Sequence, residues 1–241
     1  MEFSRSKDAK RAGFFYFAFF LTCVIAGAVR SNLLIYADAT KTAEHLRDYE
    51  WLLRISSVID LISAVLFLMA AWALYVLLKS VDKNIALLFL LLNAAGVAVQ
   101  CCSLLYTFTP MLTAGSQDLQ NAFSPTQLST FNLLSLNLHK SGFNIAQIFF
   151  GSWLCPLGLL VYRSDFLPKW LGILLIADCF GVLLWFLQSA LLPDLAFITV
   201  PGLAVSFAAE LSLSLWLMIK GAKEPPPNGK QVQDSGSARS E

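Results

Sequence analysis

Charged side chains inside long apolar runs are the residues of this sequence with the clearest potential for chemistry. Arg54 and Asp60 lie within the apolar run 51–78, and Asp178 and Glu210 lie in two later runs. A charge at the centre of a membrane-spanning helix costs roughly 2.5 to 3.5 kcal/mol on insertion scales, so it faces a bundle interior, a partner or a wet cavity. We therefore expect these side chains to bind a solute or an ion, or to pair inside the protein.

Other polar residues recur at helical spacing and enlarge this set. Ser56, Ser57 and Ser63 share a helix face with Asp60, because positions three and four apart are neighbours on a helix. Small and amide residues in such a register also pack membrane helices together, so a purely structural role is the alternative. The candidate binding residues are Arg30, Arg54, Asp60, Gln100, Lys140, Asn144, Gln147, Asp178 and Glu210.

Motifs for catalysis and metal binding are missing from the sequence. It has two histidines, neither HExxH nor GxSxG, no histidine cluster and no phosphate-binding loop. The five cysteines lie in apolar runs without CxxC spacing and are interpreted as packing residues. We predict no catalytic residue set, no metal ligands and no cofactor.

The composition is that of an integral membrane protein. Hydrophobic residues make up 57% of the chain and charged residues 14%, whereas soluble domains carry about 25% charged residues. The near balance of 17 basic and 16 acidic residues argues against nucleic-acid binding. The expected partners are the lipid bilayer and a small polar or ionic ligand; a homo-oligomer is compatible with the sequence but not supported by it.

The elements that must position these side chains are six membrane-spanning helices, so the fold class is all-α. A span needs about 20 apolar residues. Residues 1–220 form the predicted transmembrane domain, and the polar residues 221–241 a disordered cytoplasmic tail. Within the long third loop, 110–142, a Ser-Pro start signal at residue 124 predicts a short helix that lies at the interface or continues into the next span. The predicted spans cover residues 13–36, 51–78, 85–108, 143–162, 171–192 and 195–220.

The distribution of basic residues predicts that both termini are cytoplasmic. Lys and Arg concentrate on the cytoplasmic side of membrane proteins. The sequence has 17 Lys and Arg residues, and the predicted loops on the outer side contain three of them: Lys41, Arg47 and Lys140.

Depth and helix rotation predict one ion pair. Arg54 and Asp60 are six positions apart, which corresponds to about 600° of helix rotation, so they do not share a face. Arg30 lies at a comparable outer depth on the preceding helix, and we predict that it pairs with Asp60. The alternative is that Arg30 extends to the interface while Ser57 and Ser63 alone hold Asp60.

Asp178 and Glu210 form a second, deeper set. Each lies about nine residues, or about 13 Å, from the cytoplasmic end of its helix. Their helices are joined by a short turn, so the carboxyl groups can approach each other if the helix rotations allow it. Two desolvated carboxylates at one depth oppose each other's ionisation, so at least one is expected to be protonated at neutral pH.

Several blocks of the sequence also resemble a known family. They are VRSNLLIY, LLRISSVIDLISAVLFLMAAWALYVLLKSVDKNIALL, GSWLCPLGLLVYRSDFLPKWLGILL and ELSLSLWLMIKGAK. Together they are similar to DUF4386, a family of uncharacterised bacterial multi-pass membrane proteins, over most of residues 11–223. The resemblance implies a protein of the bacterial cytoplasmic (inner) membrane and implies no activity.

Three classes of function fit these observations. We favour a small transporter, channel or receptor-like binder with a polar cavity that faces outward. The first alternative is a structural or regulatory membrane partner whose polar faces only pack helices. The second is a membrane-embedded enzyme that uses Asp60, Asp178 or Glu210 in acid–base catalysis, and its sequence requirements are poorly met.

Overall fold

A computed structural model describes residues 5–33, 42 and 48–224, and in these residues all regular secondary structure is helical. Six α-helices are long, and two short α-helices and two 3₁₀ turns link them. In chain order the elements are α1 (Arg5–Leu33), α3 (Glu50–Leu78), α4 (Lys83–Leu104), η1 (Leu105–Phe108), α5 (Thr109–Gly115), α6 (Gln117–Ala122), α7 (Pro125–Arg163), α8 (Lys169–Leu191), η2 (Ala196–Thr199) and α9 (Val200–Ile219).

The six long helices are long and apolar enough to cross a membrane, which confirms the predicted six spans. Local signals in the sequence set where several of them begin. The Asp82 carboxylate accepts hydrogen bonds from two backbone N–H groups and caps the start of α4. Ser124 and Gln127 form a reciprocal capping box ahead of Pro125, which occupies the first turn of α7.

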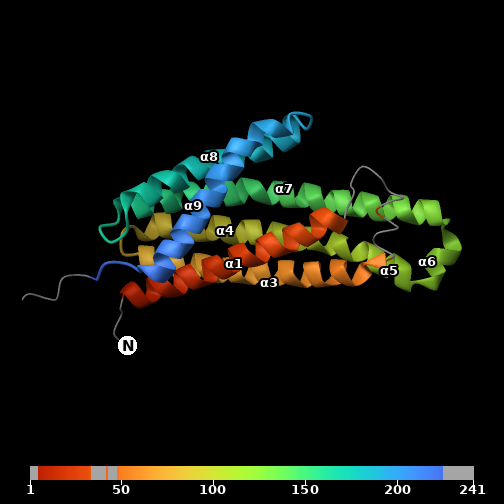
Figure 1. The fold of residues 1–241 in the computed structure, drawn as a ribbon, viewed down its shortest axis with the longest axis horizontal. Coiled ribbons are helices and arrows are strands. Elements are labelled where there is room, and N and C mark those ends of the chain that lie inside the picture. Colours follow the sequence, from red (N-terminus) through yellow and green to blue (C-terminus); the bar gives the residue numbers. More distant parts are fainter. Residues whose placement is uncertain (1–4, 34–41, 43–47, 225–241) are drawn as a thin grey trace, which may run out of the picture.

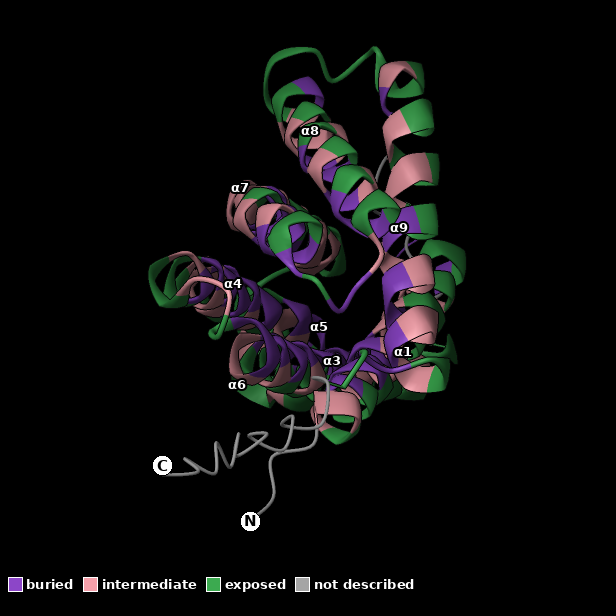
Figure 2. Cartoon of the chain, turned by 90° about the vertical axis from the view of Figure 1, so that its left-hand side faces the viewer, coloured by how far each residue is buried: buried purple, intermediate pink, exposed green. Residues whose placement is uncertain are grey.

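The long helices form a closed ring in the order α1, α3, α4, α7, α8, α9, in which α9 packs against α1 (Figures 1 and 2). Consecutive members of this ring run antiparallel. The end of the bundle that holds Arg5 and Ile219 is called the terminal end below, and the end that holds α5 and α6 the loop end. At the terminal end the Ser6 backbone N–H donates to Glu224, so the two described ends of the chain are adjacent.

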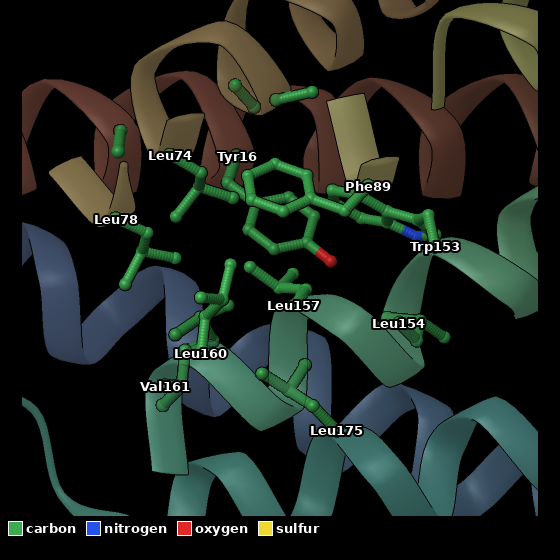
Figure 3. Packing of buried hydrophobic residues seen from close by; sticks show 14 of the residues in the cluster. Tyr16, Leu74, Leu78, Phe89, Trp153, Leu154, Leu157, Leu160, Val161 and Leu175 are labelled. Atoms are coloured by element: carbon green, nitrogen blue, oxygen red, sulfur yellow. The ribbon is translucent and has the colours of Figure 1, made fainter. Parts of the chain in front are cut away.

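Aromatic side chains fill the middle of the ring (Figure 3). The rings of Phe19 and Phe67 stack 3.9 Å apart, and Trp153 packs edge-on against Phe67 at 5.0 Å. Tyr16 and Phe89 contact the same Trp153. Each such pair contributes about 0.5 to 1.5 kcal/mol beyond burial of its area, so this cluster closes the interior between the two ends.

Two boundaries differ from the sequence prediction. The first helix starts at Arg5 instead of residue 13, since Ala9 and Ala12 are fully buried. The third span continues beyond its expected end at residue 108, because Pro110 is tolerated in the first turn of α5, where its missing N–H has no helical partner. The expected polar connector 37–50 lies mostly outside the described residues, as does the tail from residue 225.

The third loop is mostly helical rather than extended. Of the two alternatives for the helix that starts after residue 124, continuation into the next span is the one observed, and α7 runs unbroken for 39 residues. Its length is about 58 Å at ~1.5 Å per residue, roughly twice the ~30 Å hydrocarbon thickness of a bilayer. The short helices α5 and α6 precede it at the loop end (Figure 1).

Candidate functional site

A polar cleft of about 610 Å³ opens at the loop end between α1, α7, α8 and the connection from α8 to α9. Its lining includes two cationic side chains, three amides and several hydroxyl groups, and the described lining residues include no carboxylate. A hollow of about 500 Å³ among α5, α6 and the start of α7 contains none of the predicted site residues. The charged and amide residues of the cleft are Arg30, Lys140, Asn137, Asn144 and Gln188.

The cleft exists because α7 and α8 are in close contact at the terminal end and are separated by large side chains at the loop end. Near the terminal end, a Cβ on Gly158 would lie only 2.8 Å from the Gly172 carbonyl oxygen. Toward the loop end, the rings of Phe143 and Trp185 keep the helices apart, with centroids 6.1 Å from each other. Small residues at one end and aromatic residues at the other make the helix pair diverge (Figure 2).

Within the cleft, α7 and α8 remain linked by a polar contact. The Asn144 amide donates a hydrogen bond of 2.6 Å to the Ser189 hydroxyl. The adjacent residue Gln188 donates from its amide to the carbonyl oxygens of Leu192 and Pro193, which ties the end of α8 to its exit loop. These bonds fix the orientation of two of the amides that line the site.

The predicted ion pair between Arg30 and Asp60 is present and joins α1 to α3. The Arg30 side chain is 19% exposed and the Asp60 side chain 5%, so the pair is largely shielded from solvent. Because Arg30 also lines the cleft, Asp60 holds a guanidinium group at the cleft wall. The alternative in which Arg30 only extends to the membrane interface is thereby excluded.

The serine stripe beside Asp60 serves helix contacts rather than the cleft. Ser57 shares a hydrogen bond of 3.1 Å with Thr107, and Ser63 one of 3.1 Å with the Cys23 thiol. Both serines are buried. The stripe therefore packs α3 against α1 and against the turn after α4, as the structural alternative for such residues predicted.

Arg54 lies apart from the other candidates. Its side chain is 58% exposed and bonds Glu50 one turn earlier, at 2.5 Å. The rotation of α3 places Asp60 inside the bundle and Arg54 on its outer surface. Arg54 is thus no part of the cleft.

Gln100 and Gln147 are buried along the faces on which α4 and α7 pack. The same interface contains His139, whose Nδ1 lies 3.3 Å from the Ser103 hydroxyl and 3.2 Å from the Ser103 carbonyl oxygen. The structure buries His139, because α7 is already helical there and turns this residue toward α4.

Asp178 and Glu210 lie deeper than the cleft, on the neighbouring helices α8 and α9. Their carboxyl groups interact electrostatically with each other, so the helix rotations do bring them together. Asp178 is fully buried, and Glu210 is partly exposed. In the described part of the chain, no three His, Cys, Asp or Glu side chains are grouped so as to hold a metal ion.

Some residues of the site were not identified from the sequence. Trp185, Ser189 and Thr199 line the cleft, and Tyr16 contributes a buried hydroxyl near the acid pair. Ser189 could have been found, because it follows Gln188 and lies one turn beyond Trp185 on α8. Tyr16 carries no such signal, because it lies in a run of aromatic residues, and that pattern is typical of side chains that face lipid or fill a hydrophobic core.

Six membrane-spanning helices in a ring, with a polar cleft at one end, define a multi-pass membrane protein. The chain belongs to the family described as Domain of unknown function (DUF4386), which it matches over residues 11–221, and this confirms the resemblance seen in its sequence. An uncharacterized protein of Archaeoglobus fulgidus is 31% identical over 153 residues, which are 64% of this chain and 75% of that protein. No solved structure matches the chain.

Proposed function

We propose that this protein binds a small polar solute with an anionic group in the cleft between α1, α7 and α8. The observation that carries the proposal is the lining: two cations and three amides, with no carboxylate among its described residues. Guanidinium and ammonium groups donate hydrogen bonds and accept none, so they select carboxylate, phosphate or similar oxygens. A volume of about 610 Å³ is in the range of small-molecule sites.

The closed side of the cleft favours a transporter or a receptor over a channel. Beyond the cleft, the ring interior is filled by Tyr16, Phe67, Phe150 and Trp153. A solute at the loop end thus meets packed side chains instead of a continuous path. Such a one-sided site is expected for one state of an alternating-access transporter, or for a receptor that passes a signal through helix movement.

The expected location is the bacterial cytoplasmic membrane with the cleft facing outward. The membrane is the one that the family resemblance implies, and the outward direction of the cleft follows from the excess of Lys and Arg on the side of the two termini. A solute would then enter from the outer side, without crossing the hydrocarbon.

Ligand-induced stabilisation tests the proposal. Purified protein in detergent would be heated with a panel of small carboxylates, phosphates and sulfonates, each paired with a neutral analogue of the same size. A ligand at 100 times its Kd stabilises the folded state by about 2.7 kcal/mol. We expect at least one anion, and not its neutral analogue, to raise the unfolding temperature.

Variants assign that binding to the cleft. Lys140→Gln and Asn144→Ala should each weaken the affinity about tenfold or more, because the first removes a positive charge from the lining and the second removes a hydrogen-bond donor. Arg54→Gln is the matched control, since it removes a cation outside the cleft. The proposal fails if no compound of the panel stabilises the protein, or if Arg54→Gln weakens binding as much as Lys140→Gln. Uptake into proteoliposomes would then separate a transporter from a receptor.

A further inference from the structure

The Asp178 carboxyl group has no ionic partner among the described residues. The residue is fully buried, neither carboxyl oxygen makes a well-formed hydrogen bond, and the Ser206 hydroxyl on α9 is the described side chain that interacts with it as a hydrogen-bonding neighbour. A buried ionised carboxylate without a partner costs many kcal/mol, so such a group pairs with a cation, binds one or takes up a proton. The ion pair of Arg30 and Asp60 shows how this chain satisfies another buried acid, and within the described ranges Asp178 has no such counterpart.

The crossing of α8 and α9 brings a second acid close to Asp178. A Cβ on Gly181 would lie 3.1 Å from the Gly202 Cα, so the helices are in close contact there. Asp178 lies about 5 Å from Gly181 along α8, in the direction of the terminal end. Ser206 lies about 6 Å from Gly202 along α9, in the same direction. Glu210 lies one turn beyond Ser206 on the same face of α9. Ser206 is accordingly level with Asp178, Glu210 lies about one turn closer to the terminal end, and the two carboxyl groups interact electrostatically.

The third member of the site comes from α1. The Tyr16 side chain is fully buried in the aromatic cluster, and its hydroxyl has no hydrogen-bond partner (Figure 3). Gly13 packs against the α9 backbone between Ser214 and Met218, which places Tyr16 level with the turn of α9 that holds Glu210. The Tyr16 hydroxyl interacts electrostatically with both Asp178 and Glu210. Among the described residues it is therefore a polar group without a hydrogen-bond partner in the neighbourhood of the acid pair.

The other titratable groups that face the pair are thiols. Cys23 on α1 interacts with Glu210, Cys179 on α8 with Asp178, and Cys155 on α7 in turn with Cys179. Cys23 also interacts with Arg30, and that guanidinium group is already paired with Asp60.

We propose that Asp178, Glu210 and Tyr16 form a proton-binding site. Uptake of one proton converts one of the two carboxylates to a neutral carboxyl group, which can donate its O–H to the other and accept from the Tyr16 hydroxyl. A proton needs a single oxygen as its ligand, whereas hard metal cations take about six or more oxygens. The described polar groups at the site, these three and Ser206, are too few for such a shell.

The site lies beneath the cleft on the same helix face. Trp185 is seven residues from Asp178, or about 10 Å along α8, and seven residues return to nearly the same direction. A proton site at this depth, on a helix that also lines the cleft, is placed to couple protonation to movement of α8. The inference goes beyond the proposed function, because proton binding can be measured without any cleft ligand.

Infrared spectroscopy of the purified protein tests the site directly. A protonated carboxyl group has a carbonyl stretching band that an ionised carboxylate lacks. We expect the wild-type protein at neutral pH to show this band, and expect it to disappear as the pH is raised. Asp178→Asn and Glu210→Gln should each remove it, and either variant alone decides the test if the other does not fold. Tyr16→Phe should keep the band and shift its frequency, because one hydrogen bond is lost.

Two controls define the outcomes. Asp118→Asn, in the exposed helix α6, should leave the band unchanged. Replacement of sodium by choline in the buffer should also leave the carbonyl band unchanged. The proposal would be overturned if the wild-type protein at neutral pH showed no such band, or if its band persisted in both acid variants. A carboxylate signal that responds to sodium instead of pH would overturn it as well, in favour of a sodium site.

Discussion

At the scale of single residues, the ion pair between Arg30 and Asp60 is expected to dominate the polar energetics of the bundle. Breaking a buried pair by removal of one partner typically costs about 3 to 5 kcal/mol, because the other charge is left buried. Arg30→Ala and Asp60→Ala should each destabilise the protein by this amount, and the double substitution should cost less than their sum. A double-mutant cycle in mixed detergent micelles would measure the coupling.

The pair of Glu50 and Arg54 is the matched control, since it also joins a carboxylate to a guanidinium group. Both of its residues lie on α3, the helix that carries Asp60. These side chains are much more exposed, and surface ion pairs contribute about 0 to 1 kcal/mol. Glu50→Ala and Arg54→Ala should thus change the free energy of unfolding only slightly. Additive effects in the Arg30 and Asp60 cycle, or equal costs for the two pairs, would contradict the role assigned to the buried pair.

At the scale of elements, close contact between α7 and α8 depends on glycine. A Cβ on Gly172 would lie 2.6 Å from the Gly158 carbonyl oxygen and 2.6 Å from the Tyr162 backbone nitrogen. Backbone atoms cannot move away without shifting a helix, and overpacking costs typically about 1 to 3 kcal/mol. Gly172→Ala should therefore lower the unfolding temperature of the protein in detergent.

Gly27→Ala is the control for this substitution. It also adds one Cβ within a long helix, but apart from the local backbone of α1 no described heavy atom lies within 4 Å of the added carbon. Alanine is favoured over glycine in a helix by up to about 1 kcal/mol, so this variant should be as stable as the wild type or more stable. If Gly172→Ala behaved like Gly27→Ala, the close approach of α7 and α8 would not limit stability.

At the scale of the whole molecule, the orientation in the membrane decides which side the cleft faces. The charge distribution predicts that both termini are cytoplasmic and that residues 111–139 are accessible from outside. In a background without native cysteines, Asp118→Cys should react with a membrane-impermeant maleimide in intact cells. Lys79→Cys, at the terminal end, should react only after the cells are permeabilised. The opposite result for both positions would reverse the topology and place the cleft on the cytoplasmic side.

The sequence by itself determined the number of spans, their approximate limits and the turns between them. Membrane insertion depends on the apolar content of about 20 consecutive residues, and caps such as Asp82 and Ser124 act within a single turn. Even the pair of Arg30 and Asp60 was predictable, because both residues lie at one depth on helices that are consecutive in the chain. Each of these features rests on local information.

Only the tertiary structure decided which way each helix is rotated and where the ring opens. Rotation places Arg54 outside, His139 inside and Tyr16 within the buried aromatic cluster, and it depends on side chains from helices far apart in the sequence. The cleft likewise depends on the contrast between glycines at one end of α7 and α8 and aromatic rings at the other. A helical pattern gives the relative directions of residues on one helix, but packing against its neighbours sets the absolute direction, and so packing determined this site.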